Sequence, residues 1–474
     1  MVECKDVESS EDTLFLTRTP SQRRKRMKKF SIFDVKELLS FCNQANIHEK
    51  HVYRMWRAIV NHGAKSIETI PELPKVLQDF VNERCSFQTV TVTQAVHSHD
   101  GSTTKFLLTL FDQKQMESVI MRYGHVRLDS FPEKEGHTVH LPLSHPFRCA
   151  PRSTLCVSSQ VGCSMKCAFC ATGTLGLLAN LTCGEILEQL YIAQKLEPIK
   201  NVVFMGMGEP LDNYEEVIFA IKLLTDVRVF HLAAHRVTIS TVGVVPRLRQ
   251  LKQDAPCISL ALSLHAPTQK IRLKIVPTAK VWPIESILHA AIDFTKGEGT
   301  KVSGSRKNRK LLIEYVMIQN INVSAPIAHL LGEFLKSNSD WIHVNLIPYN
   351  PNFLPGTRNM QAPTDQEVSE FVTILRSYTL KVTIRQTLGQ DISSACGQLV
   401  TGKKPLNTPF SFPRLHWFNN FFHSILSHHV FFKHNFFMYS FRILPSLYFF
   451  ATLLACFSAV KLLKKTETKK FIPL

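Results

Sequence analysis

The stretch Cys163-Ser164-Met165-Lys166-Cys167-Ala168-Phe169-Cys170 holds three thiols, separated by three and then by two other residues. Thiolates are soft ligands that suit zinc, copper(I) and iron–sulfur clusters. A structural zinc site closes with four ligands, and a ferredoxin cluster also takes four cysteines. A cubane cluster held by only three thiolates keeps one iron open for a further ligand. Lys166, with Gly162 before the stretch and Gly173 after it, favours a loop around a metal group.

Two other interpretations of Cys163, Cys167 and Cys170 stay open from the residues alone. Free cysteines also pack as small hydrophobic residues, and a zinc ion could take Cys156 or Cys183 as its fourth ligand. The spacing itself resembles the signature of the radical S-adenosylmethionine (SAM) superfamily. In that superfamily three cysteines hold a [4Fe-4S] cluster, whose open iron chelates the amino and carboxylate groups of SAM.

The composition places the chain among globular proteins with an anionic partner. Its 474 residues leave room for two or three domains, and 45% of them are hydrophobic. Twelve scattered cysteines, without a secretory signal, predict reduced thiols in a cytoplasmic protein. The formal net charge of +18 favours a nucleic-acid partner, and a merely solvated basic surface is the alternative.

Residues 1–85 divide into an arm and a helical segment. Residues 1–32 begin acidic and polar, become basic at 23–29, and are predicted to form a disordered basic arm. Residues 33–85 show helical spacing of apolar residues. We expect them to form a small accessory domain that binds RNA. Its candidate phosphate contacts are Arg54, Arg57 and Lys65.

Residues 86–148 are predicted to form a β-rich linker with an insertion. Alternating apolar and polar residues at 89–92, 105–110 and 116–121 are typical of strands. The remainder, 126–148, contains three prolines and a glycine and is expected to be irregular.

Residues 149–402 alternate strands with helices and are predicted to form the core domain. The expected strands lie at 155–159, 202–205, 237–241, 258–264, 311–317, 342–347 and 380–384. The expected helices lie at about 184–197, 214–226, 284–297, 325–337 and 365–377. This alternation predicts an α/β fold whose parallel strands close into a partial or full (β/α) barrel. Ligands of such barrels bind at the carboxyl ends of the strands, and the cysteine loop follows the first of them.

Residues 403–474 form a tail rich in Phe and His, expected to be irregular and hydrophobic. Its segment 441–460 is almost wholly apolar and long enough to span a bilayer. Five lysines follow this segment, and the positive-inside rule would keep them in the cytoplasm and put the core outside. An iron–sulfur enzyme does not suit an oxidising space. We therefore favour a cytoplasmic protein over one anchored in a membrane through 441–460.

Further motifs resemble the RlmN family of dual-specificity RNA methyltransferases, members of the radical SAM superfamily. The motifs are TLCVSSQVGC (154–163), FMGMGEPLDN (204–213), SLHA (263–266), VNLIPYNP (344–351) and GQDISSACGQL (389–399). The resemblance covers roughly residues 33–402. It implies a radical SAM barrel, one [4Fe-4S] cluster, SAM, and methylation of carbon 2 of adenine in ribosomal and transfer RNA. It also implies an electron donor such as flavodoxin or ferredoxin.

The family's chemistry implies roles for two more cysteines and a carboxylate. Carbon 2 of adenine is electron-poor and cannot attack a methyl group as an ordinary nucleophile would. In the family, SAM first methylates a cysteine thiolate, and the methyl carbon then adds to adenine after a radical step. The motif match makes Cys396 the methyl carrier, Cys156 the thiol that resolves the adduct through a transient disulfide, and Glu117 the proton acceptor. A disulfide requires Cα atoms within roughly 7 Å of each other.

The same match implies a set of SAM contacts. Gly208 and Glu209 are expected to hold the methionine amino group, since a glycine lets the backbone approach closely. The expected contacts on the ribose, carboxylate and nucleoside sides are Ser240, Ser263, Leu264, His265 and Asn345. Two alternative functions remain beside this one. They are a relative that methylates carbon 8 of adenine, and a non-catalytic zinc-containing RNA-binding protein.

Overall fold

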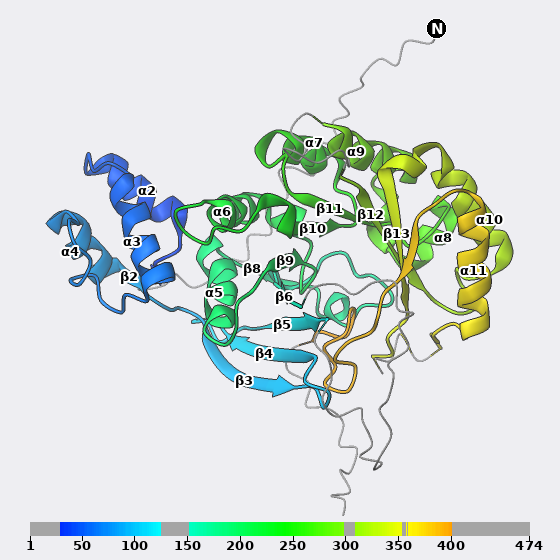
Figure 1. Ribbon diagram of the computed structural model, residues 1–474, viewed down its shortest axis with the longest axis horizontal. Helices are drawn as coiled ribbons and strands as arrows, with labels where there is room; N and C mark the ends of the chain where they lie inside the picture. Colours follow the sequence, from blue (N-terminus) through cyan, green and yellow to red (C-terminus); the bar gives the residue numbers. More distant parts are fainter. Residues whose placement is uncertain (1–28, 125–150, 298–308, 353–356, 358, 401–474) are drawn as a thin grey trace, which may run out of the picture. The chain divides into compact units, whose positions relative to one another are not determined.

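A ten-stranded sheet organises the computed structural model, which describes residues 29–124, 151–297, 309–352, 357 and 359–400 (Figure 1). The strand order is β14-β13-β12-β11-β10-β9-β6-β5-β4-β3. Neighbours from β14 to β6 are all parallel. These are β6 (Arg152–Cys156), β9 (Asn201–Phe204), β10 (Val237–Thr241), β11 (Ser259–Ser263), β12 (Leu311–Met317), β13 (Ile342–Pro348) and β14 (Val382–Ile384). Antiparallel strands extend the sheet beyond β6: β5 (Gln115–Tyr123), β4 (Thr103–Thr109) and β3 (Thr91–His97).

Helices follow the parallel strands and cover the outside of the sheet, as Figure 1 shows. Strands covered on both faces bury nearly every side chain, and β12 is buried at six of its seven positions. The helices are α5 (Cys183–Gln194), α6 (Tyr214–Thr225), α7 (Val245–Asp254), α8 (Gln269–Ile275), α9 (Ile284–Lys296), α10 (Ala325–Leu335) and α11 (Asp365–Ser377).

Reciprocal capping boxes fix where two of these helices begin. At α5 the Thr182 hydroxyl accepts from the Glu185 N–H, and the Glu185 carboxylate accepts from the Thr182 N–H. Thr364 and Glu367 make the same pair of bonds at α11. Each pair satisfies two N–H groups that the helix leaves without an internal acceptor.

The strand–helix alternation is confirmed, with differences that have local causes. Within the described residues the sheet has two ends, β14 and β3, so the barrel is partial and does not close. Helices α7 and α8 were not predicted, because α7 is mostly polar and α8 is only seven residues long. The strand expected at 89–92 instead spans Thr91–His97.

The boundaries expected near the N-terminus also need correction. The arm predicted over 1–32 ends too late, because β1 (Phe30–Ser31) pairs with β2 (Cys85–Ser86) and Ile32 is fully buried. Residues 86–124 are not a linker, since β3, β4 and β5 belong to the main sheet. The insertion at 126–148 and the tail at 403–474 lie outside the described residues.

The predicted accessory segment forms three helices, α2 (Val35–Gln44), α3 (Lys50–His62) and α4 (Lys75–Arg84). Their buried faces belong to the same hydrophobic cluster as the interior of the sheet. Trp56 of α3 is fully buried, and its indole N–H donates to the carbonyl of Ile32 at 2.7 Å. Arg228, which follows α6, lies over the ring of Tyr53 with its guanidinium carbon 3.4 Å from the centroid.

A buried carboxylate joins the N-terminal segment to the core. Glu188 of α5 is fully buried and accepts from the Ser31 hydroxyl at 2.6 Å. It also accepts from the Thr89 hydroxyl and from the N–H groups of Thr89 and Val90, each at 2.8 Å. Burial raises the pKa of Glu188 to about 7, and these donors lower it. One side chain therefore accepts hydrogen bonds from the chain just before the accessory segment and from the chain just after it.

No helix in the described part of the chain is long and apolar enough to cross a bilayer. The candidate membrane segment 441–460 lies outside that part.

Replacing Glu188 with alanine is expected to lower the free energy of unfolding by about 3 kcal/mol, because buried donors would lose their acceptor. Urea unfolding followed by circular dichroism measures this change. Glu370→Ala on the exposed face of α11 is the matched control, expected to change stability by less than about 0.5 kcal/mol. Equal effects of the two substitutions would contradict a specific role for Glu188.

Candidate active site

The cysteine loop lies inside a small hairpin at the carboxyl end of β6. Strands β7 (Gln160–Gly162) and β8 (Leu177–Asn180) pair antiparallel on either side of it. Gly162 has φ +76°, and a Cβ there would lie 1.9 Å from the carbonyl oxygen of Gly176. The Cys163 N–H donates to that same carbonyl at 2.9 Å. Only glycine fits this crossing, so Gly162 sets where the loop begins.

Main-chain hydrogen bonds tie the loop to segments far along the chain. The Ala168 N–H donates to the carbonyl of Ile275 at 2.8 Å, and the Ala171 N–H donates to that of Gly397 at 2.7 Å. The ring of Phe169 meets His265 edge-on, with centroids 5.0 Å apart. The loop therefore rests on α8, on the end of β11 and on the segment that carries Cys396.

A cavity of about 870 Å³, including the open space at its mouth, lies beside the loop. Most of the site residues predicted from the sequence line it: Cys163, Cys167, Cys170, Gly208, Glu209, Ser240, Ser263, His265 and Cys396. The three loop cysteines follow β7, and Gly208 and Glu209 follow β9. Ser240 and Ser263 lie in the last residues of β10 and β11, His265 follows β11, and Cys396 follows β14. The carboxyl ends of the parallel strands thus gather three thiols, a carboxylate, an imidazole and a fourth thiol around one space.

The remaining predicted residues do not line this cavity. Leu264 points into the core, and its carbonyl accepts from Arg272 Nε at 3.0 Å. Asn345 of β13 donates to both carboxylate oxygens of Glu314 at 3.3 Å. It is Glu314, a residue not predicted, that reaches the cavity wall. Its signal in the sequence is a single carboxylate within the apolar strand β12.

Glu117 and Cys156 lie behind the cavity wall. Glu117 of β5 is buried; its carboxylate accepts from the Val400 N–H at 2.9 Å and pairs with Lys105 at 3.1 Å. Burial raises the pKa of Glu117, and Lys105 lowers it. Cys156, the last residue of β6, is buried, and its carbonyl accepts from the Ser118 hydroxyl at 2.9 Å. Glu117 is thus bonded to the segment that follows Cys396.

Cys396 and Cys156 share one electrostatic neighbourhood. Cys156 is buried and Cys396 is exposed, yet desolvation by the surrounding protein raises the pKa of both thiols, that of Cys156 to about 12. A charge on Cys396 raises the pKa of Cys156 further, whereas the Arg385 guanidinium lowers the pKa of both. Arg385, just after β14, pairs with Glu314 at 3.6 Å and lines the cavity. Both cysteines are free thiols in this structure.

At Gly208 the main chain packs closely against Gln160, and Glu209 provides a buried carboxylate. Gly208 has φ +104°, and a Cβ there would lie 2.6 Å from the side chain of Gln160. Glu209 accepts from the N–H groups of Leu211 at 3.0 Å and Val242 at 2.9 Å. It forms no ion pair with a described residue, and burial followed by the nearby Asp212 raises its pKa to about 7. Such a carboxylate fits the ammonium group of an amino-acid ligand.

His265 is held as a neutral donor. Its φ of +61° is unusual for a residue with a side chain. The Asn322 amide donates to its carbonyl at 2.9 Å, and its Nδ1 accepts from the Val316 N–H at 3.1 Å. Burial, followed by the charge of Arg272, lowers the pKa of His265 to about 3. The neutral ring therefore carries its proton on Nε2, which is free to donate to a ligand.

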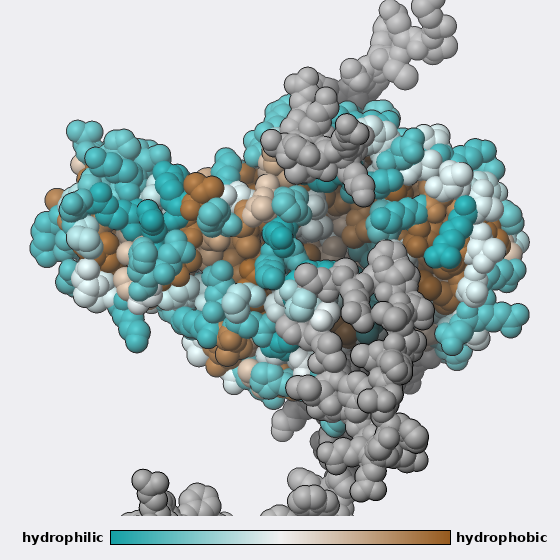
Figure 2. All heavy atoms as spheres, viewed as in Figure 1, coloured by the Kyte–Doolittle hydropathy of each residue, from teal (hydrophilic) through white to brown (hydrophobic). Residues whose placement is uncertain are grey.

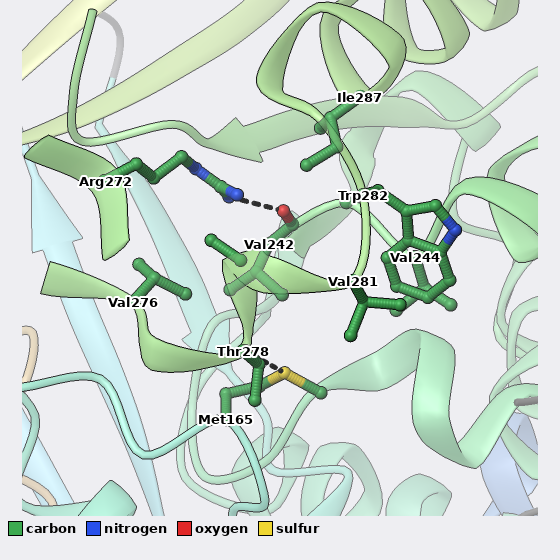
Figure 3. Close-up of a pocket in the computed structure, with 11 residues that line it drawn as sticks. Met165, Val242, Val244, Arg272, Val276, Thr278, Val281, Trp282 and Ile287 are labelled. Carbon is green, nitrogen blue, oxygen red and sulfur yellow. Dashed lines mark hydrogen bonds between the residues drawn. The ribbon is translucent and has the colours of Figure 1, made fainter. Parts of the chain in front are cut away.

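Arg272 is a structural residue that the sequence did not single out. It is 1% exposed and donates to the carbonyls of Val242 at 2.6 Å, Ser263 at 3.1 Å and Leu264 at 3.0 Å. Figure 3 shows it above a smaller apolar cavity of about 280 Å³, with its bond to Val242. Its guanidinium thereby joins the ends of β10 and β11. Little in the sequence indicates this structural role of Arg272, because a charged residue on a short helix is usually exposed.

The donor set fits a cluster better than a single metal ion. Among the described residues no group of three His, Cys, Asp or Glu side chains is placed to hold one metal ion. A zinc ion would need sulfur ligands at about 2.3 Å from one centre. The thiols of Cys163, Cys167 and Cys170 line one cavity and suit a cluster in which each binds a different iron. Tyr349, also on the wall, has a buried hydroxyl with no partner among the described residues.

Comparison with known proteins identifies relatives that cover most of this chain. The Radical SAM superfamily matches residues 157–301. Ribosomal RNA large subunit methyltransferase N of Nitrosopumilus maritimus is 38% identical over 345 residues, 71% of this chain and 88% of the relative. The probable dual-specificity RNA methyltransferase RlmN of Carboxydothermus hydrogenoformans is 32% identical, covering 79% of this chain and 98% of the relative. A radical SAM methyltransferase from Sphaerobacter thermophilus superposes with a TM-score of 0.64 at 30% identity, covering 78% and 99% of the two chains.

The imidazole of His265 is expected to stay neutral from pH 8 to about pH 4, because its pKa in the folded protein is about 3. In the unfolded chain a histidine titrates near 6.5. The unfolded state therefore binds a proton first as the pH falls, and stability is lost progressively below about pH 6.5. Imidazole ¹⁵N NMR of the folded protein should show protonated Nε2 and unprotonated Nδ1 throughout. A titration of His265 near pH 6.5 in the folded protein would contradict this geometry.

Proposed function

Because this chain belongs to the RlmN family of the radical SAM superfamily, we propose that it methylates carbon 2 of adenine in ribosomal RNA, transfer RNA or both. It is an RNA methyltransferase that uses one [4Fe-4S] cluster and SAM. The observation that carries the proposal is the shared cavity, in which Cys396 lies on the wall with Cys163, Cys167 and Cys170. A methyl carrier beside the cluster is what an electron-poor carbon requires.

We infer that the three loop cysteines hold the cluster and that Glu209 receives the ammonium group of SAM. The raised pKa of Glu209 supports this, because an ammonium partner would favour its charged form. The Nε2–H of His265 and the hydroxyls of Ser240 and Ser263 offer donors on the same wall. When bound, the cluster and SAM supply the reductive cleavage that provides a carbon radical able to remove a hydrogen atom.

In the first half of the reaction Cys396 acts as a nucleophile. With SAM bound, its thiolate sulfur would attack the methyl carbon, the carbon–sulfur bond of the sulfonium would break, and S-adenosylhomocysteine would leave. Desolvation raises the pKa of Cys396, and the positive charge of Arg385 opposes this shift and so favours the thiolate. Glu314 pairs with Arg385 and keeps the guanidinium at the cavity wall. The charge of Glu314 itself raises the pKa of Cys396, so within this pair it is the guanidinium that favours the thiolate.

In the second half Cys156 frees the product. Once the methyl carbon of Cys396 is joined to adenine, the carbon–sulfur bond must break. Loss of the proton on carbon 2 and homolysis of the carbon–sulfur bond would release the base with a methylene group that takes up a proton to become methyl. The sulfur radical left on Cys396 would join the thiolate of Cys156 as a disulfide, and the surplus electron would return to the cluster. The charge interaction between the two thiols supports this pairing. The Glu117 carboxylate accepts a hydrogen bond from the Val400 N–H, four residues after Cys396, and we propose Glu117 as the final proton acceptor.

We infer that RNA is bound partly by the accessory helices. Their visible surface is largely hydrophilic in Figure 2. Arg57 and Lys65 are exposed there and make no ion pair with a described residue, whereas Arg54 pairs with Glu72. The net charge of +18 favours phosphate contacts. We propose an electron donor such as reduced flavodoxin or ferredoxin, and a cytoplasmic location.

Product analysis tests the proposal directly. The anaerobically reconstituted enzyme, with SAM and a reductant, is incubated with ribosomal or transfer RNA, and nucleosides are separated by mass spectrometry. We expect 2-methyladenosine. A product methylated at carbon 8 would favour the alternative relative, and absence of SAM cleavage would favour a non-catalytic RNA-binding protein.

Replacing Cys396 with alanine is expected to abolish methyladenosine formation, because the methyl group would have no carrier. Cluster content and RNA affinity should stay near wild-type values. Cys257→Ala, which removes an exposed thiol, is the matched control and should keep full activity. Methyladenosine made by Cys396→Ala would refute the covalent carrier.

Replacing Cys156 with alanine is expected to trap the protein–RNA adduct, because the bond to Cys396 could no longer be broken. A denaturing gel of the reaction with labelled RNA detects the adduct as a slowly migrating band. Cys183→Ala is the control, since Cys183 is equally buried but lies on α5. If no adduct accumulates in Cys156→Ala, the resolving role is wrong.

A further inference from the structure

An unpaired basic surface borders the outer side of the cysteine loop. We call Lys166, Lys270, Lys274 and Lys280 the loop-face lysines; all four are exposed, and none forms an ion pair with a described residue. Lys166 belongs to the loop, Lys270 and Lys274 to α8, and Lys280 to the 3₁₀ turn Pro277–Lys280. Each of the four lies either in the cysteine loop or in a segment that is hydrogen-bonded to it.

Two hydrogen bonds bring these segments together. The Ala168 N–H donates to the carbonyl of Ile275 at the end of α8. The Thr278 hydroxyl donates to the sulfur of Met165 at 3.3 Å, a contact visible in Figure 3. The loop therefore packs against α8 and the following turn, and their exposed lysines border one surface.

Negative charge is missing from the segments that form this surface. Neither 157–184 nor 264–284 contains an aspartate or a glutamate. The acidic side chain hydrogen-bonded to the loop is Asp212, and its carboxylate already accepts from the Ser164 hydroxyl at 2.7 Å. Leu273, 39% exposed, lies between the lysines of α8. The surface thus combines an apolar residue with unopposed positive charges.

We propose that the loop-face lysines and Leu273 dock a small acidic electron-transfer protein that reduces the cluster. The inference rests on the proposed function, in which the loop cysteines hold that cluster. One electron passes from the reduced donor to the cluster, so that the donor is oxidised and the cluster reduced. Lys166 is the neighbour of Cys167 in the chain, so a donor on this surface stands one layer of main chain away from the cluster ligands.

The composition of the surface favours an acidic protein over RNA. Electron-transfer partners bind through small, weak interfaces that are guided by opposite charges. RNA-binding surfaces typically stack bases on aromatic rings and on arginine planes. The four cations here are lysines, and Arg272 of the same helix is buried in backbone contacts. The exposed apolar residue on α8 is the aliphatic Leu273.

Charge reversal on α8 and its following turn tests the proposal. The variant Lys270→Glu/Lys274→Glu/Lys280→Glu leaves the cysteine loop unchanged. The control is Lys200→Glu/Lys310→Glu/Lys381→Glu, which makes the same change in net charge. Each control lysine is exposed and directly precedes a parallel strand (β9, β12 or β14), so it lies at the opposite edge of the sheet.

Two measurements with purified acidic flavodoxin or ferredoxin are compared: its affinity for the enzyme by calorimetry, and the rate of cluster bleaching in stopped flow. We expect both to fall about tenfold or more in the α8 variant and to change less than about twofold in the control. The wild-type affinity should weaken with added salt, and that dependence should be smaller in the variant. Unchanged donor affinity in the α8 variant would overturn the proposal.

Separate assays distinguish the other outcomes. With dithionite in place of the protein donor, the α8 variant should methylate RNA at the wild-type rate, which shows that its cluster and cavity are intact. If RNA affinity falls instead while donor affinity holds, the surface binds RNA and the proposal is wrong. If even the wild type makes no methyladenosine with dithionite, the proposed function fails, whereas the donor-binding measurement still tests the surface.

Discussion

The hydrogen bond from Ala171 to Gly397 joins the two sulfur-bearing segments on which the site depends. One segment follows the first parallel strand of the sheet, and the other follows the last, β14. The curvature of the sheet alone does not bring these two segments together, because the described sheet does not close into a full barrel. The C-terminal segment must return across the mouth of the partial barrel and bond to the loop. The position of Cys396 beside Cys163, Cys167 and Cys170 follows from that return.

The antiparallel strands give the returning segment its support. The His99 N–H, in the turn between β3 and β4, donates to the Asp391 carboxylate at 2.8 Å. Lys105 of β4 donates to the carbonyl of Ser393 at 3.2 Å, and Glu117 of β5 accepts from the Val400 N–H. Strands first interpreted as a linker are thus a platform for the carrier cysteine. The placement of Glu117 is explained by this support whether or not it also receives a proton.

Sequence patterns predicted part of the cavity wall, including its thiols, and little of what supports that wall. Gly208, Glu209 and His265 lie where strands end, which is why motif and topology agreed on them. Leu264 stands in one of these motifs but points into the core. Asn345 lies on the same face of the sheet as Glu314, its partner in the register of β12 and β13, and Glu314 is the one of the two that lines the cavity. Glu314 and Arg385 were not predicted, because their role depends on an ion pair between a side chain of β12 and one just after β14. Such contacts between distant segments have no local signature.

The way the Cys396 segment is held has a consequence for motion. Its anchors are individual hydrogen bonds, such as Ala171–Gly397 and Glu117–Val400, together with a few buried apolar side chains, such as Leu399. Each hydrogen bond contributes roughly 1 kcal/mol, far less than unfolding the barrel costs. We expect the segment to open at a lower free energy than the sheet, so that it can move while the sheet stays intact. A sulfur that must face first a cofactor, then a nucleobase and finally another thiol needs that freedom.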